Sequence, residues 1–512
     1  MLVKCFGAAV QGINATVVTI EVNVSQGIKF FLVGLPDNAV RESRERILSA
    51  LTHNRYKFPR QQVIINMAPA DIKKEGSAYD LPLAMGMLAG NGQINSEKLG
   101  EYIIMGELSL DGSILPIKGA LPIAIMAKEQ GFKGFILPEE NAKEAAVVQG
   151  INIYGVSKIT EVVNFLEGET DLEDIKVENN KDFTEEDYKY DVDFSDVKGQ
   201  EQVKRAMEIA AAGGHNIILI GPPGAGKSML AKRLPTILPP LSLSEALETT
   251  KIHSVAGRIP KGAALVHKRP FRSPHHTISD IALVGGGSYP QPGEISLAHN
   301  GVLFLDELPE FKRTVLEVMR QPLEDRHICI SRASNTVEYP ASFMLVASMN
   351  PCPCGYYNHP DKECVCAPGA VKKYLNKISG PLLDRIDIHM EIIPVPFEDL
   401  SRKPVGESSE TIRKRVINAR KIQEERYKLE EGIYCNAQMN SKLLRKHAQL
   451  NEECKKRIQF AMKKLNLSAR AYDRILKVSR TIADLDNSKN IEIQHITEAI
   501  NYRNLDKEGW AG

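Results

Sequence analysis

Long apolar runs are missing from this sequence of 512 residues. No stretch has the length and hydrophobicity that a helix needs to span a bilayer. Residues 1–7 (MLVKCFG) also lack the positively charged leader and apolar core of a signal peptide. From these absences we expect a cytoplasmic protein without a membrane partner.

An excess of one charge is also missing, because 65 basic residues nearly balance 64 acidic ones and leave a net charge of +1. Any nucleic-acid binding must therefore come from a local basic surface. Cysteine is scarce, and eight cysteines are too few for a disulfide scaffold of this size. No repeat of fixed period is visible.

A phosphate-binding loop is the strongest feature that is present. Residues 215–228 read HNIILIGPPGAGKS, an apolar strand pattern that leads into GxxxxGKS and then into helix formers. The glycines let backbone N–H groups turn toward phosphate oxygens, and the following helix presents its positive N-terminus. Lys227 is predicted to reach the β- and γ-phosphates and Ser228 to offer its hydroxyl to Mg²⁺. The predicted ATP-binding residues of this loop are Gly221, Pro222, Pro223, Gly224, Ala225, Gly226, Lys227, Ser228 and Met229.

A second apolar run, residues 301–305 (GVLFL), ends in Asp306 and Glu307. The run is too continuous for a half-exposed strand and is typical of a strand buried on both faces. Asp306 is predicted to hold Mg²⁺ together with Ser228, and Glu307 to orient or activate the attacking water. The alternative is that the two carboxylates merely cap a strand.

The pattern along the chain indicates four segments. Residues 1–166 alternate strand and helix patterns, for example strands at 15–24 and 103–110 and helices at 37–51 and 81–88, which predicts a mixed α/β domain. Residues 167–193 are acidic and polar and are expected to be a linker. Residues 194–400 show the strand and helix alternation of a parallel α/β core, and residues 401–512 are predicted to be a helical domain.

Three polar side chains extend the predicted catalytic site. Asn350 follows the apolar run 343–349, at the end of a predicted core strand. Its polar side chain is suited to hold the attacking water near the γ-phosphate. Arg385 is a candidate arginine finger, and Arg470 begins a helical pattern of the C-terminal domain. Taken alone, an arginine is more often a solvated surface residue.

The order of these motifs resembles the magnesium-chelatase-like AAA+ family, in particular its ComM/YifB branch. The resemblance covers nearly the whole chain and includes PGEISLAH, LFLDE, MNPCPCG, SGPLLDRID and LSARAYDRILKVSRTIADL. It implies that Asn350 is the sensor asparagine, Arg385 a finger that acts on the neighbouring subunit and Arg470 the lid-domain sensor. It also implies an ATPase that forms a hexameric ring, with a P-loop core and a helical C-terminal lid.

The N-terminal domain resembles the Lon-type protease fold, but the peptidase residues do not match. Lon-type peptidases carry the nucleophile in a DGPSAG-like turn, and the matching EGSAYD stretch places Ala78 there, with Ser77 one residue away. The position of the activating lysine falls on Leu121, although Lys118 is near in sequence. Because a serine nucleophile needs a base within hydrogen-bond reach, we expect an α+β domain without peptidase activity.

Two segments between the catalytic motifs are candidates for contact with DNA. The first contains Arg269 and Arg272 in RPFRSPHHT and continues to a run of three glycines. The second, residues 326–339, is predicted to be a β-hairpin with Arg332 near its tip. Arginines suit phosphate contacts that tolerate any sequence and weaken with salt. The alternative is that either loop packs against a neighbouring subunit or a protein partner.

Four of the eight cysteines lie in one short segment, as CPC at 352–354 and CVC at 364–366. In a reducing compartment, Cys352, Cys354, Cys364 and Cys366 favour a tetrahedral zinc site over disulfides. The zinc would be structural, and the alternative is a reduced loop without metal.

Two functions remain open on the sequence. The first is a DNA-translocating ATPase, which in this branch means helicase or branch-migration activity during recombination of transforming DNA. Such a motor is expected to bind single-stranded or branched DNA with low sequence specificity and to act with recombination proteins. The second is a motor of the chelatase type, or one that remodels proteins, built on the same ring. The Lon-like front domain disfavours the chelatase function.

Overall fold

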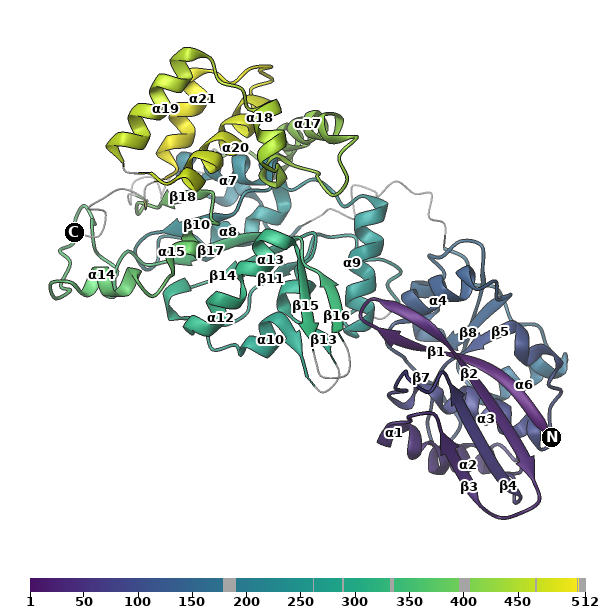
Figure 1. Ribbon diagram of the computed structural model, residues 1–512. Coiled ribbons are helices and arrows are strands. Elements are labelled where there is room, and N and C mark those ends of the chain that lie inside the picture. Colours follow the sequence, from purple (N-terminus) through teal and green to yellow (C-terminus); the bar gives the residue numbers. More distant parts are fainter. Residues whose placement is uncertain are drawn as a thin grey trace. The chain divides into compact units, whose positions relative to one another are not determined.

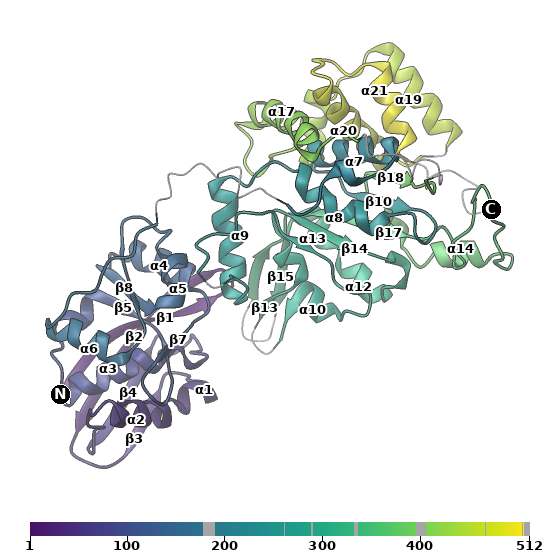
Figure 2. The same cartoon turned by 180° about the vertical axis from the view of Figure 1, so that it is seen from behind.

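The computed structural model describes residues 1–177, 190–260, 262–287, 290–331, 336–395, 406–465, 467–503 and 505. Figures 1 and 2 show its ribbon from two opposite sides. The chain forms two compact units, Met1–Asp182 with Leu243–Val266, and Phe183–Ser242 with His267–Gly512. Within the described residues, no helix has the length and hydrophobicity needed to cross a membrane.

The first unit is built on a seven-stranded sheet in the order β3-β4-β2-β1-β5-β8-β9. β1 and β4 both pair with β2 in antiparallel fashion, and the remaining neighbours are parallel. Alternate residues of β2, Val18, Ile20 and Val22, are fully buried, as the period of two in its sequence predicts. The strands are β1 (Leu2–Gln11), β2 (Asn14–Ser25), β3 (Phe30–Val33), β4 (Gln62–Ala68), β5 (Tyr102–Ile104), β8 (Gly134–Pro138) and β9 (Asn152–Val156), with the separate pair β6 (Glu107–Leu108) and β7 (Ile114–Leu115).

Helices pack on this sheet and complete the mixed α/β unit. α3 is buried along its whole length, because its small and apolar residues lie against β1 and β2. The helices are α1 (Asn38–Arg41), α2 (Ser43–His53), α3 (Asp80–Gly90), α4 (Ala120–Glu129), α5 (Glu139–Ala145) and α6 (Ile159–Glu167). The helix predicted at 37–51 is divided at Glu42 into α1 and α2, and the strand predicted at 103–110 is divided into β5 and β6.

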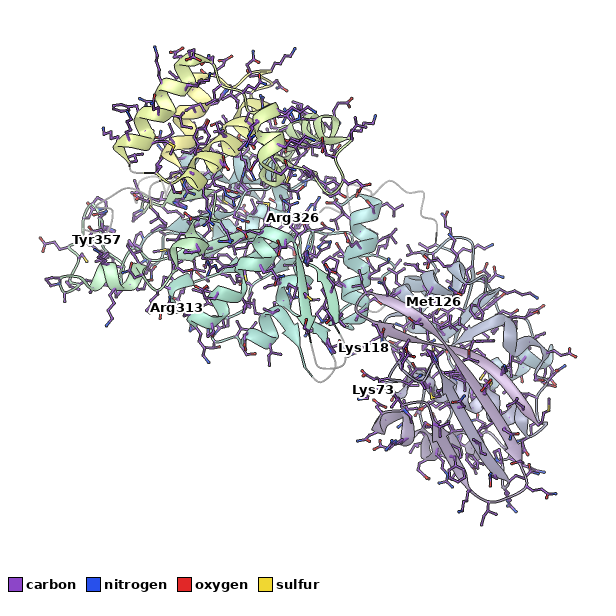
Figure 3. The ribbon with its side chains drawn as sticks, viewed as in Figure 1. Lys73, Lys118, Met126, Arg313, Arg326 and Tyr357 are labelled. Atoms are coloured by element: carbon purple, nitrogen blue, oxygen red, sulfur yellow. The ribbon has the colours of Figure 1, made fainter. Side chains whose placement is uncertain are left out.

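One helix of this unit comes from far along the chain. α9 (Leu243–Val255) follows the helix after the phosphate-binding loop in sequence, yet it packs against α4 of the first unit. The backbone N–H of Gly119 donates to the carbonyl of Ser254 at 3.2 Å, and the hydroxyl of Ser254 donates to the buried carboxylate of Glu144. A side chain at Gly257 would meet the stem of Lys118, which Figure 3 labels. Residues 243–266 are therefore folded with the N-terminal residues.

The second unit contains a five-stranded parallel sheet in the order β11-β14-β17-β10-β18. Each residue of β10, β14 and β17 is buried, which agrees with the continuous apolar runs in the sequence. The strands are β10 (Ile217–Ile220), β11 (Phe271–Arg272), β14 (Val302–Leu305), β17 (Met344–Met349) and β18 (Ile388–Glu391), with the outlying pairs β12 (Gly285–Gly286) with β13 (Gln291–Pro292) and β15 (His327–Ser331) with β16 (Thr336–Pro340). The antiparallel β15–β16 pair confirms the predicted hairpin.

Helices flank the parallel sheet and form the C-terminal part of the unit. The core helices are α7 (Glu201–Gly213), α8 (Lys227–Ile237), α10 (Asp280–Val284), α11 (Glu294–Leu297), α12 (Arg313–Val318), α13 (Arg320–Asp325), α14 (Ala370–Leu375) and α15 (Gly380–Leu383). The later helices are α17 (Ser409–Tyr427), α18 (Ser441–His447), α19 (Glu452–Lys464), α20 (Ala469–Leu485) and α21 (Ile493–Asn501). The parallel α/β core and the helical C-terminal region are both as predicted.

The predicted linker, residues 167–193, is in part folded. Leu172, Ile175 and Val177 pack on the core of the first unit, and the N–H of Ile175 donates to the carbonyl of Ile153 at 2.9 Å. Residues 178–189 lie outside the described part of the chain. The few apolar positions of this acidic segment are therefore enough to attach its first third to the sheet edge at β9.

Candidate active site

The predicted phosphate-binding loop joins β10 to α8 and ends at Lys227, the first residue of that helix. Gly224 and Gly226 have φ angles of 77° and 86°, in the left-handed region where a side chain is strained. These glycines let the loop turn onto the N-terminus of α8, whose first backbone N–H groups have no partner within the helix. The local geometry therefore fits a phosphate chain.

Lys227 is buried at the base of this loop, with 9% of its surface exposed. Its Nζ donates to the carbonyls of Gly221 at 2.7 Å and Pro222 at 2.9 Å and to Oδ1 of Asn350 at 3.0 Å. Burial lowers the pKa of Lys227, and the charges of nearby carboxylates oppose this effect. An ammonium group buried among uncharged acceptors fits an anionic ligand, so nucleotide phosphates match the site.

Ser228 and Asp306 form the oxygen pair expected for Mg²⁺. The hydroxyl of Ser228 donates to Oδ2 of Asp306 at 2.8 Å, and Oδ1 of Asp306 accepts from the hydroxyl of Ser348 and from the N–H of Glu307 at 3.1 Å. Hydroxyl and carboxylate oxygens are suitable Mg²⁺ ligands. The sequence analysis gave Ser348 no role, although a polar residue inside the apolar strand β17 is a signal for one.

Glu307 lies just past the end of β14 with its side chain half exposed. Its φ of 54° places a non-glycine residue in the left-handed region, a conformation that recurs at functional sites. Nδ1 of His276 lies 3.4 Å from a carboxylate oxygen of Glu307. His276 belongs to the segment predicted to contact DNA, and no sequence pattern indicated that it lies beside Glu307, the predicted catalytic carboxylate.

Adjacent parallel strands bring these groups together. β14, β17 and β10 are neighbours in the sheet, and Asp306, Asn350 and the phosphate-binding loop each follow the carboxyl end of one of them. Ligands of open parallel sheets bind outside this edge. The Ser228–Asp306 and Lys227–Asn350 contacts therefore join three separate sequence motifs at one site.

Arg385 lies in a different environment. It is 8% exposed, its Nη2 lies 2.5 Å from a carboxylate oxygen of Glu324, and its Nη1 donates to the carbonyl of Pro381. The side-chain amide of Asn216, just before β10, donates to the carbonyl of Arg385 at 3.0 Å and accepts from the N–H of Leu345 at 2.9 Å. Asn216 therefore fixes the backbone of the predicted finger to two strands of the nucleotide site, which the sequence analysis did not foresee.

A buried charged group lies beside this segment. Nδ1 of His215 is 3.2 Å from Oδ2 of Asp387, Nε2 is 2.8 Å from the hydroxyl of Thr481 on α20, and Arg474 is 3.0 Å from Asp387. Burial lowers the pKa of His215, and Asp387 opposes this effect. Burial favours the neutral form of Asp387, but Arg474 and His215 hold the pKa of Asp387 well below its ordinary value. The group joins the start of β10 to the C-terminal helices.

Arg470 is in the first turn of α20, as the sequence predicts, and Ser468 is the N-cap of this helix. Its side chain is 65% exposed, and its Nη1 lies 3.4 Å from the carboxylate of Asp384. This contact places Arg470 next to the residue that precedes Arg385. Its predicted contact with phosphate stays a prediction.

The arginines predicted to contact DNA are in unequal positions. Arg269 donates to the carbonyls of Pro239 and Asn300 at 2.6 and 2.7 Å. Arg272 makes two hydrogen bonds of 2.6 Å to the carboxylate of Glu294. Arg332 lies outside the described residues. The contacts of Arg269 and Arg272 stabilise the core, so their binding to DNA stays a prediction without support from this geometry.

The four clustered cysteines approach one another closely. The Sγ atoms of Cys352, Cys354, Cys364 and Cys366 all lie within 4.8 Å of one another. Cys352 is 3.3 Å from Cys354 and 3.7 Å from Cys364, and Cys354 is 3.6 Å from Cys364. These residues form a group that could hold a metal ion, which is compatible with the predicted zinc.

The peptidase positions of the first unit agree with the expected loss of activity. Ser77 donates its hydroxyl to the carboxylate of Glu107, and Leu121 is fully buried. A carboxylate in contact with the hydroxyl does not supply the lysine base of Lon-type chemistry. The absence of peptidase activity remains a prediction.

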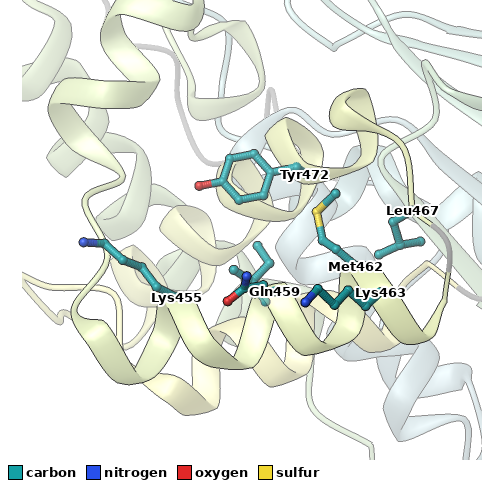
Figure 4. A pocket seen from close by; sticks show the side chains of 7 residues that line it. Lys455, Gln459, Met462, Lys463, Leu467 and Tyr472 are labelled. Carbon is teal, nitrogen blue, oxygen red and sulfur yellow. The ribbon is translucent and has the colours of Figure 1, made fainter.

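Cavities are found among the described residues of the second unit. A cavity of about 590 Å³ is lined by helix α19 together with Leu467 and Tyr472, and Figure 4 shows the lysines Lys455 and Lys463 at its rim. It contains none of the predicted ATP-binding residues. The smaller cavity borders Gly221 and Pro222 of the phosphate-binding loop and lies beside the cysteine-rich loop.

Three family models match successive parts of this chain. They describe magnesium chelatase subunit ChlI, over residues 20–141 and 193–400, and the C-terminal region of the same subunit, over residues 406–503. The three matches include much of the first unit, the predicted nucleotide site and the helical C-terminal region.

Curated proteins resemble the chain over nearly its whole length. Competence protein ComM of Haemophilus influenzae is 43% identical over 506 residues, covering 97% of this chain and 96% of that protein. The uncharacterized protein YifB of Escherichia coli is 44% identical, covering 98% and 96%. A magnesium-chelatase 38 kDa subunit of Cereibacter sphaeroides is 27% identical over 31% of this chain and 52% of that protein.

Proposed function

Because the chain belongs to the magnesium chelatase ChlI family, in its ComM/YifB branch, we propose that it is an ATP-hydrolysing motor that moves along DNA. The proposed activity is strand separation or branch migration during recombination of transforming DNA. We propose DNA as the substrate because the chain is similar to a protein named for competence. ATP hydrolysis is supported by two contacts that meet at one edge of the parallel sheet. These are the hydrogen bonds of Lys227 with Asn350 and of Ser228 with Asp306.

Each residue of this edge has a distinct chemical task. Lys227 binds the phosphates and supplies positive charge as negative charge develops on the transferred group. Mg²⁺ held by Ser228 and Asp306 supplies further charge neutralisation when nucleotide is bound. Asn350, which already accepts from Lys227, orients the attacking water. Glu307, exposed at the end of β14, accepts or directs the proton of that water.

We propose that the motor is a homo-hexameric ring in which Arg385 completes the site of a neighbour. Within the chain Arg385 pairs with Glu324, so it must exchange this partner for phosphate at an assembled interface. Arg470 is exposed at the start of α20 and is proposed to contact nucleotide from the lid. An arginine supplied from a second subunit makes hydrolysis depend on assembly.

For the DNA contact we propose Arg332, which follows β15 in the sequence and lies outside the described residues. Arg269 and Arg272 are proposed as a second contact only if they exchange their present carbonyl and carboxylate partners for phosphate. Phosphate contacts of this kind bind single-stranded or branched DNA with low sequence specificity. A motor on DNA with eight free cysteines suits the reducing cytoplasm, where we propose that it acts.

We also propose that the cysteine cluster holds one structural Zn²⁺. Four thiolates are the ligand set of closed zinc sites, and their Zn–S distances of about 2.3 Å require S–S separations of about 3.8 Å in a tetrahedron. The Sγ–Sγ distances among Cys352, Cys354 and Cys364, 3.3 to 3.7 Å, are close to this separation.

The decisive experiment measures the ATPase rate of the wild-type chain alone and with single-stranded, duplex and branched DNA. We expect at least one form to stimulate hydrolysis several-fold. Equal rates with every form, in protein that hydrolyses ATP, would favour the alternative, a protein-remodelling or chelatase-type motor. No hydrolysis in any form, with ATP bound, would contradict the ATPase itself.

A further inference from the structure

The cysteine cluster lies in a loop that begins at the nucleotide site. β17 ends at Met349, Asn350 contacts Lys227, and Cys352 follows two residues later. No helix or strand is formed between Asn350 and α14, which begins at Ala370. In the absence of regular hydrogen bonding, such a loop needs another constraint to hold one conformation.

The cluster provides that constraint at the near end of the loop. The Sγ atoms of Cys352 and Cys364 are 3.7 Å apart although twelve positions separate the two residues. The N–H of Tyr357 donates to Sγ of Cys352 at 3.3 Å, which closes a turn around that sulfur. A metal shared by the thiolates would therefore fix residues 352–366 as one unit.

The cysteine-rich segment 352–366 is in direct contact with the phosphate-binding loop. Gly355 has a φ of 86°, and a methyl carbon placed on it would lie 2.5 Å from Cδ of Pro223. There is room for the two loops to meet only because residue 355 lacks a side chain. Gly355 is buried by this contact.

Beyond this contact the two loops enclose the small cavity beside the nucleotide site. Gly221 and Pro222 line one side, Tyr357 and His359 line another, and residues 391–394, from the last residue of β18 onward, line the third. Figure 3 labels Tyr357 in this loop. The cavity lies on the β18 side of β10, whereas Asp306 follows β14, on the other side of β10.

We propose that metal binding by the four cysteines is linked to nucleotide binding by the phosphate-binding loop. The metal holds the loop so that Gly355 supports Pro223 and Asn350 stays against Lys227. When the metal leaves, residues 351–360 lose this conformation, and nucleotide must then order them as it binds. The inference rests on the proposed ATP site and does not depend on DNA.

If metal binding affects nucleotide binding, nucleotide binding must also affect metal binding. If the metal raises the affinity for nucleotide, then nucleotide raises the affinity for the metal by the same factor. A purely structural zinc that stabilises the loop without this contact has no such effect. The reciprocal effect therefore separates coupling from simple stabilisation.

The first test compares nucleotide affinity with and without metal. Zinc content is measured by elemental analysis, and Kd is measured with a fluorescent ATP analogue, for wild-type chain and for the double variant Cys364→Ser with Cys366→Ser. We expect about one zinc per chain in the wild type and none in the variant, with Kd raised about tenfold in the variant. Cys329→Ser, at an exposed cysteine outside the cluster, should change neither quantity.

Should the double variant fail to fold, as judged by circular dichroism, the wild-type chain is stripped with a chelator and then reloaded with Zn²⁺. Kd must rise on stripping and return on reloading. An unchanged Kd in folded metal-free protein overturns the inference, as does a wild-type chain that neither contains nor binds zinc.

The second test measures the rate at which a chromogenic chelator removes zinc, with and without ATP and Mg²⁺. We expect ATP to slow the removal several-fold in the wild type. In Lys227→Ala the zinc should remain bound, and ATP should have no effect on its removal. Removal that is insensitive to ATP in a wild type that binds ATP contradicts the linkage. A failure of the proposed motor function would instead show as normal linkage without stimulation by DNA.

Discussion

At the scale of single residues, the nucleotide site combines one buried cation with two carboxylates in different environments. Asp306 is tied by Ser228 and Ser348, which suits a metal ligand that must stay in place. Glu307 is half exposed, with a carboxylate oxygen 3.4 Å from Nδ1 of His276, and this exposure leaves it available to a water. The two adjacent acidic residues therefore have separable tasks, and single substitutions can distinguish them.

Glu307→Gln should bind ATP with nearly normal affinity and lose about 10²- to 10⁴-fold of the hydrolysis rate, because an amide does not accept the proton of water. Lys227→Ala should instead weaken ATP binding itself by about tenfold or more. Equilibrium binding and steady-state hydrolysis are measured on the same preparations. Normal turnover by Glu307→Gln would remove this residue from the mechanism.

His215 predicts a pH dependence of stability. Burial lowers its pKa from the ordinary value of 6.5. Below about pH 6.5 the unfolded chain therefore binds a proton at His215 that the folded chain does not bind. As the pH falls below 6.5, the free energy of unfolding decreases by up to about 1.4 kcal/mol per pH unit, and above pH 6.5 this residue has no such effect. Asp387 titrates below this window, because its pKa is also lowered.

The measurement compares chemical unfolding at pH 7.5 and 5.5 for the wild type and for His215→Gln. The variant should lose less stability between the two pH values than the wild type, since the amide has no proton to gain. An identical loss in both proteins would show that His215 is not the group responsible. Other buried histidines, such as His389, are unchanged in this comparison.

At the scale of elements, two insertions distinguish this chain from a bare parallel α/β core. The hairpin β15–β16 precedes β17, and α9 follows α8 in sequence. α9 packs in the first unit, so the chain passes between the two units at residues 182–183, 242–243 and 266–267. A buried hydrogen bond from the hydroxyl of Ser254 to the carboxylate of Glu144 connects α9 to the first unit.

Ser254→Ala should destabilise the first unit by about 1–3 kcal/mol, because it removes a donor from a buried carboxylate. Burial raises the pKa of Glu144, so the loss is expected to shift this group further toward its protonated form. Ser49→Ala, which removes an exposed hydrogen bond to Leu110, is the matched control and should change stability little. Equal effects of the two changes, in chemical unfolding, would argue against a stabilising role for α9.

Arg332→Ala should weaken DNA binding for every sequence and lower the slope of log affinity against log salt by about 0.9, the value for one phosphate contact. Binding is measured at several salt concentrations. Arg457→Ala, an exposed arginine on α19, serves as the control and should leave the slope unchanged. A parental slope and affinity in Arg332→Ala would exclude Arg332 as the DNA contact.

At the scale of the whole molecule, the position of Arg385 bears on assembly. Its guanidinium is held by Glu324 in the single chain, while its backbone is fixed to the start of β10 by Asn216. Through Asn216, the backbone of Arg385 is connected to the proposed nucleotide site of its own chain, while its side chain is proposed to act on the site of a neighbour. If Arg385 acts on a neighbouring chain as proposed, hydrolysis requires two chains, one supplying the phosphate-binding loop and the other the arginine.

A mixture of Arg385→Ala and Lys227→Ala chains tests this requirement. Under subunit exchange in a hexamer, about a quarter of the interfaces pair an intact phosphate-binding loop with an intact finger, so about a quarter of the wild-type ATPase rate should return. Each variant alone should be nearly inactive. Mixtures that never exceed either parent would place the finger elsewhere or exclude exchange between subunits.

The nucleotide motifs could be predicted from the sequence because their chemistry is local. The glycines with positive φ, Lys227 and the helix N-terminus lie within one loop, and the continuous apolar runs of β10, β14 and β17 are typical of strands buried on both faces. The hairpin β15–β16 and the clustered cysteines are local as well. Their spacing alone was enough to predict a turn and a group of thiols.

Contacts between distant segments depended on the tertiary structure. Ser348 on Asp306, His276 beside Glu307 and Asn216 on Arg385 each join residues that no local pattern relates. The ion pair of Arg272 with Glu294 and the packing of α9 on α4 are of the same kind. Sequence patterns determine which faces are apolar and which turns are sharp, whereas the choice of partner for a polar group depends on which strands become neighbours. That choice is made only when the chain has folded.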